Sequence, residues 1–253
     1  MSQILLSAKN ITRRFGGLVA INNVSIDLPL GAVHSVIGTN GAGKSTLVSI
    51  LSGELAPNEG RIIMNQQDVT AWSQPRRAQA GLGRSYQRTT IFPSLSVHEN
   101  CRLTAQARHQ HFWNWVSPAR KCKLSNEAAD EALRLAGLEG QGDRPAGLLS
   151  HGGKRQLEIA MSLATHPKVL LLDEPLAGMG PEETDRMLDL LDSLKADHAI
   201  LLVEHDMDAV FRVSDIITVM VNGAVIAHGD PDTIRNDPQV QTAYLGDESG
   251  EDA

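Results

Sequence analysis

The stretch Gly38-Thr39-Asn40-Gly41-Ala42-Gly43-Lys44-Ser45-Thr46 fits the pattern G-x-x-x-x-G-K-[ST]. A short β-branched run, residues 33–37, precedes it, and apolar residues at helical spacing follow it over residues 47–51. A strand, a glycine-rich loop and a helix in this order form the context that a P-loop requires. The sequence therefore predicts a phosphate-binding loop.

The residue types in this loop suit phosphate binding. Glycines let backbone N–H groups turn inward around phosphates, and the positive end of the following helix adds its dipole. Lys44 supplies a cation, and Ser45 offers a hydroxyl to Mg²⁺. The alternative, a glycine-rich turn with an incidental lysine, is disfavoured by the flanking strand and helix. The candidate nucleotide-binding residues of the loop are Gly38, Asn40, Gly41, Gly43, Lys44, Ser45 and Thr46.

Composition narrows the possible functions. The chain has 253 residues and 42% apolar content, which suffices for a buried core in one large domain or two small ones. A net charge of −7, with no basic run, makes nucleic acid an unexpected partner. No signal pattern is visible, and the longest apolar runs fall far short of the roughly 20 residues that span a bilayer. Cys101 and Cys122 lack metal-ligand spacing, which favours two free thiols in a reduced cytosolic protein.

Hydrophobic periodicity predicts a β-rich region followed by a helical one. Residues 4–15 and 18–28 alternate around Gly16-Gly17 as two antiparallel strands would, and residues 61–65 continue the strand pattern. Residues 98–108, 126–136 and 153–164 have helical spacing and predict an inserted helical subdomain. Phe15 ends the first strand. Its ring is either a core aromatic or a platform on which a nucleotide base stacks. The aromatic cluster in residues 109–115 is either local packing or an exposed patch for a partner.

Two apolar runs after Pro167 predict buried parallel strands that end in charged residues. Residues 169–172 lead into Asp173-Glu174, and residues 199–203 lead into Glu204-His205. Between them, residues 181–194 have the pattern of an amphipathic helix, and residues 216–227 form a hairpin around Asn222-Gly223. Ligands of open parallel sheets bind at the carboxyl ends of the strands. Asp173, Glu174 and His205 are therefore expected on the same edge as the P-loop.

A P-loop beside an Asp-Glu pair supplies the parts needed for phosphoanhydride hydrolysis. These are an anion cradle, a carboxylate for Mg²⁺ and a second carboxylate that orients or deprotonates water. Asp173 is the metal-ligand candidate and Glu174 the candidate base. The alternative, a charge at a helix N-terminus, is disfavoured by the four apolar residues before the pair and by the P-loop upstream.

Further motifs resemble those of ABC-transporter ATPases. Leu149-Ser150-His151-Gly152-Gly153 resembles the LSGGQ signature, and Val169-Leu170-Leu171-Leu172-Asp173-Glu174-Pro175 resembles the Walker B strand. Gln87 is similar to the Q-loop glutamine, His205 to the switch histidine and Phe15 to the adenine-stacking aromatic. The resemblance covers residues 4–246. It implies a single α/β P-loop NTPase domain with a RecA-like core (4–87 and 168–246), an antiparallel β subdomain, an inserted helical subdomain (88–167) and a disordered acidic tail (247–253).

Within this family, the sequence is similar to the ATPases of bacterial branched-chain (hydrophobic) amino acid importers. The similarity lies in residues 14–18, 149–152, 174–179, 204–207 and the closing Tyr244-Leu245-Gly246, and lipopolysaccharide-export ATPases share only the last of these. Two departures stand out. His151 and Gly153 replace a Gly and the Gln of the signature, and Gly180 replaces the D-loop aspartate of many relatives. A signature Gln contact with nucleotide and a D-loop carboxylate are therefore not implied.

The resemblance implies a mechanism and partners. ATP and Mg²⁺ are the implied cofactors, with Ser45, Gln87 and Asp173 around the metal, Glu174 as the base and His205 on the γ-phosphate. Two ATPase chains, identical or different, would face head to tail, so that Ser150 and Gly152 of one complete the other's site. Permease subunits would contact residues 89–96 and connect the chain indirectly to a periplasmic solute-binding protein. This places the chain at the cytoplasmic face of the inner membrane.

Other functions remain open at this point. The importer could carry urea, amides or other small solutes, and a lipopolysaccharide-export type is a further alternative. A soluble ABC protein acting on nucleic acid or the ribosome is expected to show a second cassette or a basic arm, and the sequence has neither. A catalytically dead regulatory subunit is disfavoured by the intact Lys44, Asp173, Glu174 and His205. The solute is expected to touch other subunits, so this chain does not encode its identity.

Overall fold

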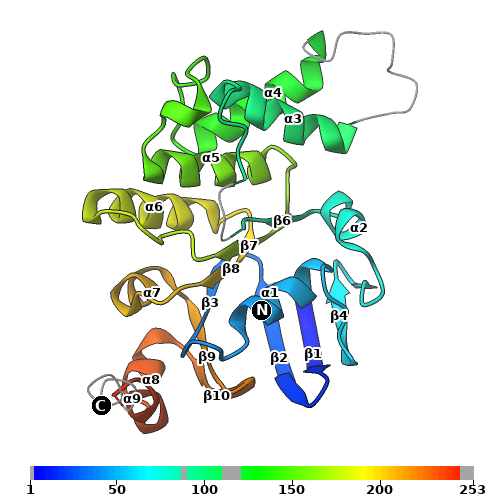
Figure 1. Ribbon diagram of the computed structural model, residues 1–253, viewed down its shortest axis with the longest axis vertical. Helices are drawn as coiled ribbons and strands as arrows, with labels where there is room; N and C mark the ends of the chain where they lie inside the picture. The colour runs from blue at the N-terminus through cyan, green and yellow to red at the C-terminus, as the bar shows by residue number, and fades with distance from the viewer. Residues whose placement is uncertain (1–2, 87–89, 110–120, 246–253) are drawn as a thin grey trace.

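The computed structural model describes residues 3–86, 90–109 and 121–245. Among these, a six-stranded sheet in the order β10-β9-β3-β8-β7-β6 lies at the centre, with helices on both faces (Figure 1). Neighbouring strands from β9 to β6 pair in parallel, and β10 pairs antiparallel with β9. The strands of this sheet are β3 (Ala32–Gly38), β6 (Leu82–Arg84), β7 (Val169–Asp173), β8 (Ala199–Val203), β9 (Ile216–Val221) and β10 (Ala224–Gly229).

A four-stranded antiparallel sheet, in the order β2-β1-β4-β5, packs beside α1 (Lys44–Ser52). Its long hairpin turns at Gly16, whose φ of 58° lies in the left-handed region that favours glycine. The predicted antiparallel hairpin and the strand after the P-loop helix are confirmed. The strands are β1 (Ile4–Phe15), β2 (Leu18–Pro29), β4 (Glu59–Met64) and β5 (Gln67–Asp68).

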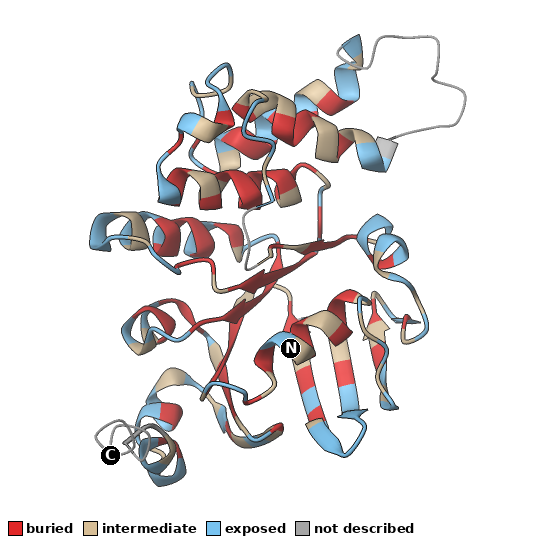
Figure 2. Ribbon diagram, viewed as in Figure 1, coloured by how far each residue is buried: buried red, intermediate tan, exposed pale blue. Residues whose placement is uncertain are grey.

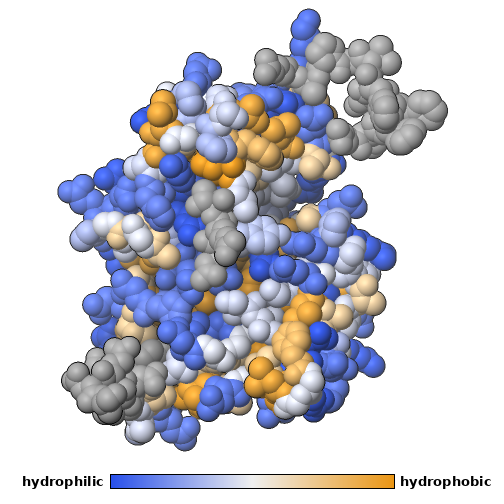
Figure 3. Space-filling view, in the orientation of Figure 1, coloured by the Kyte–Doolittle hydropathy of each residue, from blue (hydrophilic) through white to orange (hydrophobic). Residues whose placement is uncertain are grey.

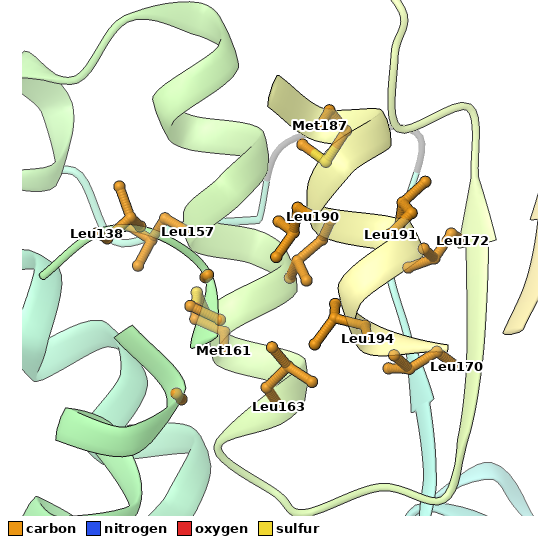
Figure 4. Packing of buried hydrophobic residues seen from close by; sticks show 14 of the residues in the cluster. Leu138, Leu157, Met161, Leu163, Leu170, Leu172, Met187, Leu190, Leu191 and Leu194 are labelled. Atoms are coloured by element: carbon orange, nitrogen blue, oxygen red, sulfur yellow. The ribbon is translucent and has the colours of Figure 1, made fainter. Parts of the chain in front are cut away.

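Strand β7 is buried on both faces, as its continuous apolar run predicts (Figure 2). Its alternate residues belong to two different cores. Val169 and Leu171 pack with α1 and the antiparallel sheet. Leu170 and Leu172 pack with α6 (Pro181–Leu194) and α5 (His151–Leu163), where Leu191 and Leu194 lie against them (Figure 4). The strand therefore separates the two main cores of the protein.

Three helices, α3 (Val97–His109), α4 (Lys123–Leu135) and α5, pack together above α6 in Figure 1. Their existence and type are confirmed. Helix α5 begins two residues before the predicted 153, because the Ser150 side chain caps it by accepting a hydrogen bond from the Gly153 N–H at 3.1 Å. Gln87, the aromatic cluster in residues 109–115 and the tail 247–253 fall wholly or mainly outside the described residues, and these predictions stay predictions.

Several short elements gave no periodic signal in the sequence, since three to eight residues show too little of a helical period. Besides the short strands, these are α2 (Gln74–Gln79), a 3₁₀ helix (Ala146–Leu148), α7 (Met207–Val213), α8 (Pro231–Arg235) and α9 (Pro238–Leu245). Aspartates cap two of them, since Asp206 and Asp230 accept hydrogen bonds from N–H groups in the first turns of α7 and α8.

Two further predictions can be compared with the structure. Cys101 is buried and Cys122 partly exposed, and both are free thiols, as predicted. Within the described ranges, no helix combines the length and the apolar character that crossing a bilayer requires.

Candidate functional site

The P-loop connects the end of β3 to α1 and is closely packed on two sides. A Cβ on Gly38, whose φ is 151°, would lie 2.0 Å from the backbone oxygen of Met220 in β9. A Cβ on Gly43, with φ 98°, would lie 2.5 Å from the backbone oxygen of Ala20 in β2. Only glycine fits at both positions, because the loop is held between two strands. The loop is therefore shaped by its surroundings before any ligand binds.

Lys44 places its ammonium group inside this loop. The residue is 6% exposed, and its Nζ donates hydrogen bonds to the backbone oxygens of Gly38 at 2.7 Å and Thr39 at 3.0 Å. Burial lowers the pKa of Lys44, while the charges of Glu174 and Asp173 raise it. The cation thus lies within the electrostatic reach of the two carboxylates predicted to act with it.

The loop surface and the start of α1 suit an anion. Helix α1 has Gly43 as its N-cap, no side-chain cap and no acidic residue in its first turn. Its N-terminal N–H groups and its dipole are therefore free of a competing carboxylate from that turn. Asn40, Gly41 and Ser45 are exposed, and Thr46 is partly exposed. These residues fit the phosphate groups of a nucleotide.

Asp173 ends β7 and is 4% exposed. Burial raises its pKa, as does the charge of Glu174, whereas Arg84, Lys44 and His205 lower it. Within the described ranges its Oδ1 atom is buried and has no hydrogen-bond partner. A buried carboxylate oxygen without a partner suits a hard divalent cation such as Mg²⁺.

The metal ligands expected here are few. In the part of the chain that the structure describes, no group of three or more His, Cys, Asp or Glu side chains could hold a metal. Mg²⁺ at phosphate sites usually takes one or two carboxylates and completes its shell with waters and substrate phosphates. A single buried Asp173, close enough to Lys44 of the P-loop to influence its pKa, fits this kind of site, and the exposed hydroxyl of Ser45 is a second candidate ligand.

Glu174 and His205 meet at the carboxyl ends of neighbouring strands. Glu174 Oε1 lies 2.6 Å from His205 Nε2, a hydrogen bond between a carboxylate and an imidazole. The Glu174 N–H donates to the backbone oxygen of Val203 at 2.9 Å, which ties the end of β7 to β8. Glu174 also has a φ of 52°, a conformation that residues other than glycine adopt at an energetic cost. The sequence prediction that these two side chains share one edge of the sheet is confirmed.

Glu204 was not recognised from the sequence as a site residue. It is 4% exposed and accepts hydrogen bonds from the N–H groups of Leu176 at 2.7 Å and of His205 at 3.3 Å. Burial raises its pKa to about 7, although the two backbone N–H groups act in the opposite direction. One feature of the sequence could have identified it as a site residue, since it is the first charged residue after a fully apolar strand.

Phe15 lies at the turn of the β1–β2 hairpin, paired with Leu18. The residue is 45% exposed, and the Arg13 guanidinium lies 4.7 Å from the ring centroid. Apolar side chains gather over this hairpin in Figure 3. Ala20, which follows in β2, contacts the P-loop at Gly43, so the hairpin brings an exposed aromatic ring to the neighbourhood of the phosphate loop.

The comparisons with known proteins agree with this geometry. The sequence profile of the ABC transporter family matches residues 21–177. The chain belongs to the ABC transporter family. A second profile, that of the branched-chain amino acid ATP-binding cassette transporter, matches residues 224–249. The predicted ABC ATPase fold is confirmed, and the chain is an ATP-binding, ATP-hydrolysing cassette.

Named ABC relatives match nearly the whole chain. The high-affinity branched-chain amino acid transport ATP-binding protein LivG of Escherichia coli K12 is 38% identical, covering 98% of this chain and 100% of LivG. BraF of Pseudomonas aeruginosa, with the same description, is 37% identical over the same shares. The lipopolysaccharide export protein LptB of Haemophilus influenzae is 29% identical, covering 96% of this chain and 98% of LptB.

Solved ABC cassettes have the same fold. A nucleotide-free ATP-binding cassette from an ABC transporter superimposes with a TM-score of 0.86 at 32% identity, covering 96% of this chain and 99% of that one. A cassette in its ADP conformation gives a TM-score of 0.85 at 30% identity, covering 97% and 100%. The comparison thus extends over the P-loop, the strand ends and the helical region together.

The ABC signature lies apart from the P-loop. Ser150 and Gly152 stand at the start of α5, which Figure 1 shows on the other side of β7 from α1. Ser150 Oγ donates to Glu183 Oε1 at 2.8 Å, and a Cβ on Gly152 would lie 2.6 Å from the Glu183 carboxyl carbon. Glu183 was not recognised from the sequence as a site residue. The sequence pattern indicated only that it lies in the first turn of the helix over residues 181–194. The structure thus brings the P-loop, Asp173, Glu174 and His205 together and leaves the signature pair elsewhere.

Proposed function

We propose that this chain is the ATP-hydrolysing subunit of an importer for branched-chain or other hydrophobic amino acids. ATP hydrolysis by this chain is supported above all by the 2.6 Å hydrogen bond between Glu174 and His205, at the strand ends near Lys44. The substrate class is supported by the C-terminal profile match and by the similarity to LivG and BraF.

Each nucleotide contact has a physical basis in the loop. The adenine ring stacks on Phe15. Backbone N–H groups of the loop and of the first turn of α1 surround the phosphates, and they belong to the segment that includes Gly38, Asn40, Gly41, Gly43 and Thr46. Lys44 neutralises phosphate charge. Ser45, Asp173 and Gln87 would hold Mg²⁺, which would stabilise negative charge on the phosphate oxygens.

Glu174 and His205 carry the hydrolytic step. Glu174 accepts a proton from, or orients, the water that attacks the γ-phosphorus, and the bond to the β,γ-bridging oxygen breaks. His205 contacts the γ-phosphate and, through its hydrogen bond, keeps the Glu174 carboxylate in register with the water. In the chain as described, the two groups already lie within hydrogen-bond distance.

Ser150 and Gly152 complete the site of a second ATPase subunit in this proposal. The two residues start a 13-residue helix, and a helix N-terminus attracts an anion through its unpaired N–H groups and its dipole. Because they lie apart from this chain's own P-loop, a head-to-tail dimer brings them to the partner's γ-phosphate. The partner is either a second copy or a related chain.

The coupling surface is proposed around residues 89–96, of which 90–96 are described. Phe92 there is 51% exposed, and Leu148 on the adjoining 3₁₀ helix is 65% exposed. A cavity of about 240 Å³ lies nearby, lined in part by Tyr86, Thr90 and Glu158. We infer that permease subunits bind this surface, hold the chain at the cytoplasmic face of the inner membrane and connect it indirectly to a periplasmic solute-binding protein.

The domain division remains part of this proposal. A core of residues 4–87 and 168–246 would bind ATP, and residues 88–167 would rotate against it when the γ-phosphate is lost.

An uptake experiment tests the proposal. Cells carry this chain together with the permease and solute-binding proteins of the proposed importer, and uptake of labelled leucine, isoleucine and valine is measured against labelled urea. Glu174→Gln should lower hydrolysis by roughly 10²–10⁴ and abolish uptake of the amino acids. Glu182→Gln, an exposed carboxylate change in α6, is the control and should leave both unchanged. Uptake of urea alone would overturn the substrate class, and amino acid uptake that survives Glu174→Gln would overturn the hydrolytic role.

A further inference from the structure

Glu204 lies between the two loops that carry the hydrolytic residues. It directly follows β8, is 4% exposed, and uses both carboxylate oxygens. Oε1 accepts the N–H of Leu176 at 2.7 Å, and Oε2 accepts the N–H of His205 at 3.3 Å. One buried side chain therefore bonds to the loop after Glu174 and to the backbone of His205.

The backbone around Glu174 depends on two consecutive residues of the neighbouring strand end. The Glu174 N–H donates to the oxygen of Val203 at 2.9 Å. Pro175 has no N–H, so the next backbone donor along the chain is Leu176, which donates to Glu204. Glu174 itself has a φ of 52°, and such a conformation persists only when its surroundings fix it. Val203 and Glu204 supply acceptors on both sides of this strained residue.

We propose that Glu204 is a positioning residue for ATP hydrolysis, whose carboxylate fixes the loop after Glu174 relative to His205. Through this link it holds Glu174 Oε1 at 2.6 Å from His205 Nε2. A carboxylate suits the position because both of its oxygens accept hydrogen bonds, whereas an amide offers one acceptor and one donor group. The inference rests on the proposed roles of Glu174 and His205 in hydrolysis.

The test uses the full chain with Glu204→Gln, which keeps the shape of the side chain and can satisfy only one of the two N–H groups. We expect kcat for ATP hydrolysis to fall by about 10- to 100-fold, the scale of loss from a small misplacement of reacting groups. ATP affinity, measured by calorimetry, should stay unchanged, because the phosphates bind at the P-loop. A loss of affinity that parallels the loss of kcat, or a kcat like that of the wild type, overturns the inference.

Asp215→Asn is the matched control. Asp215 Oδ2 accepts the N–H of Val33 at 2.9 Å, a carboxylate-to-backbone link at the opposite end of β3 from the P-loop. This variant should keep the kcat of the wild type. An equal loss of kcat in both variants would mean that any such link affects hydrolysis through general rigidity, and it would overturn a specific role for Glu204.

A double-mutant cycle with His205→Ala separates positioning from a structural effect. If Glu204 acts through the Glu174–His205 pair, Glu204→Gln should add little to the loss caused by His205→Ala in single-turnover hydrolysis. If the double variant shows the product of the two single-variant losses in rate, the proposal is contradicted. Should Glu204→Gln fail to fold in a thermal unfolding control, Glu204→Asp keeps the charge and is too short to reach both N–H groups, and the same outcomes apply to it.

Glu174→Gln measured in parallel distinguishes this inference from the proposed function. Hydrolysis near the wild-type rate in Glu174→Gln would overturn the hydrolytic role and the inference together. A hydrolytically inactive Glu174→Gln beside a fully active Glu204→Gln would overturn the inference alone.

Discussion

Ser150 Oγ donates a hydrogen bond to Glu183 Oε1 at 2.8 Å, so the signature serine is bound to a carboxylate from α6. The same carboxylate lies against Gly152, where an added Cβ would come within 2.8 Å of both its oxygens. A negative charge therefore already occupies the helix N-terminus at which, in the proposed dimer, the partner's γ-phosphate would bind.

Removing that charge should strengthen the ATP-dependent dimer. In the Glu174→Gln background, Glu183→Gln should tighten dimerisation in ATP by about 3- to 30-fold, because a helix N-terminus stabilises an anion by about 0.3–1 kcal/mol at each of two sites. Sedimentation velocity measures the dimer constant. Glu182→Gln changes the neighbouring exposed carboxylate and should leave the constant unchanged. An unchanged or weaker dimer with Glu183→Gln would mean that the carboxylate does not compete at this position.

Lys44→Ala should weaken ATP binding by about 10- to 100-fold, since a hydrogen bond to a charged group contributes about 1.5–3 kcal/mol. Isothermal titration calorimetry measures the affinity. Lys168→Ala removes an exposed lysine just before β7, at the other end of the sheet, and should bind ATP like the wild type. Equal affinities for the wild type and Lys44→Ala would contradict the P-loop assignment.

His205→Ala should lower hydrolysis by about 100-fold and leave ATP affinity nearly intact, because its hydrogen bond acts on the placement of Glu174. The two quantities are measured by phosphate release and by calorimetry. His166→Asn serves as the control, since Asn tolerates the φ of 47° found at that position. Hydrolysis that survives His205→Ala would show that the imidazole has no part in the reaction.

Arg77→Ala should lower the free energy of unfolding by about 3 kcal/mol or more, because it removes the side-chain donor from three backbone oxygens, two of them at buried residues. The guanidinium of Arg77 donates to the oxygens of Ile50 and Leu51 at the end of α1 and to that of Thr70. Urea denaturation measures the difference. Arg76→Ala removes an exposed guanidinium lying 3.9 Å from the ring centroid of Trp72 and should cost less than about 1 kcal/mol. Equal losses at the two positions would contradict this account.

His34 should make stability depend on pH. Burial lowers its pKa from 6.5 to about 4, so the unfolded chain binds a proton between these values while the folded protein does not. The contribution of His34 to the free energy of unfolding should therefore fall as pH drops from 6.5 to 4, by up to about 3 kcal/mol. Glu204, with its pKa raised to about 7, acts in the opposite direction between pH 7 and 4.5.

The difference between the wild type and His34→Gln isolates the histidine, since Glu204 is common to both. The unfolding free energies of both proteins are measured by urea denaturation at several pH values. On acidification the wild type should lose stability relative to His34→Gln. Gln can still bond to Asp27 and Thr218, the two partners of the imidazole. Parallel pH curves for the two proteins would refute the role of His34.

The sequence predicted those parts of the fold and site that follow from local pattern. The P-loop, the apolar strands before Asp173 and Glu204, and the helix of residues 181–194 each show a motif or a period in a short window. Parallel strand order then brings Glu174 and His205 to one edge of the sheet.

The remaining features depend on contacts between distant parts of the chain. Glu183 meets a serine 33 residues away, Glu204 meets an N–H 28 residues away, and Arg77 reaches oxygens 26 and 27 residues away. No local pattern shows which partner such a side chain will find. Gly180, at the position that the resemblance assigns to the D-loop, likewise gave no indication that Glu183, three residues later, would face the signature.

The alternation of β7 between two cores has a consequence for how the protein tolerates change. Deleting one residue from 169–172 would exchange the side chains that face α1 with those that face α6, and it would shift Asp173 and Glu174 out of line with β8. Such a deletion would disturb both halves of the interior and the hydrolytic carboxylates in one event. An insertion or deletion in this strand is therefore expected to reduce stability and hydrolytic activity together. A substitution that keeps the length of the strand can change one without the other.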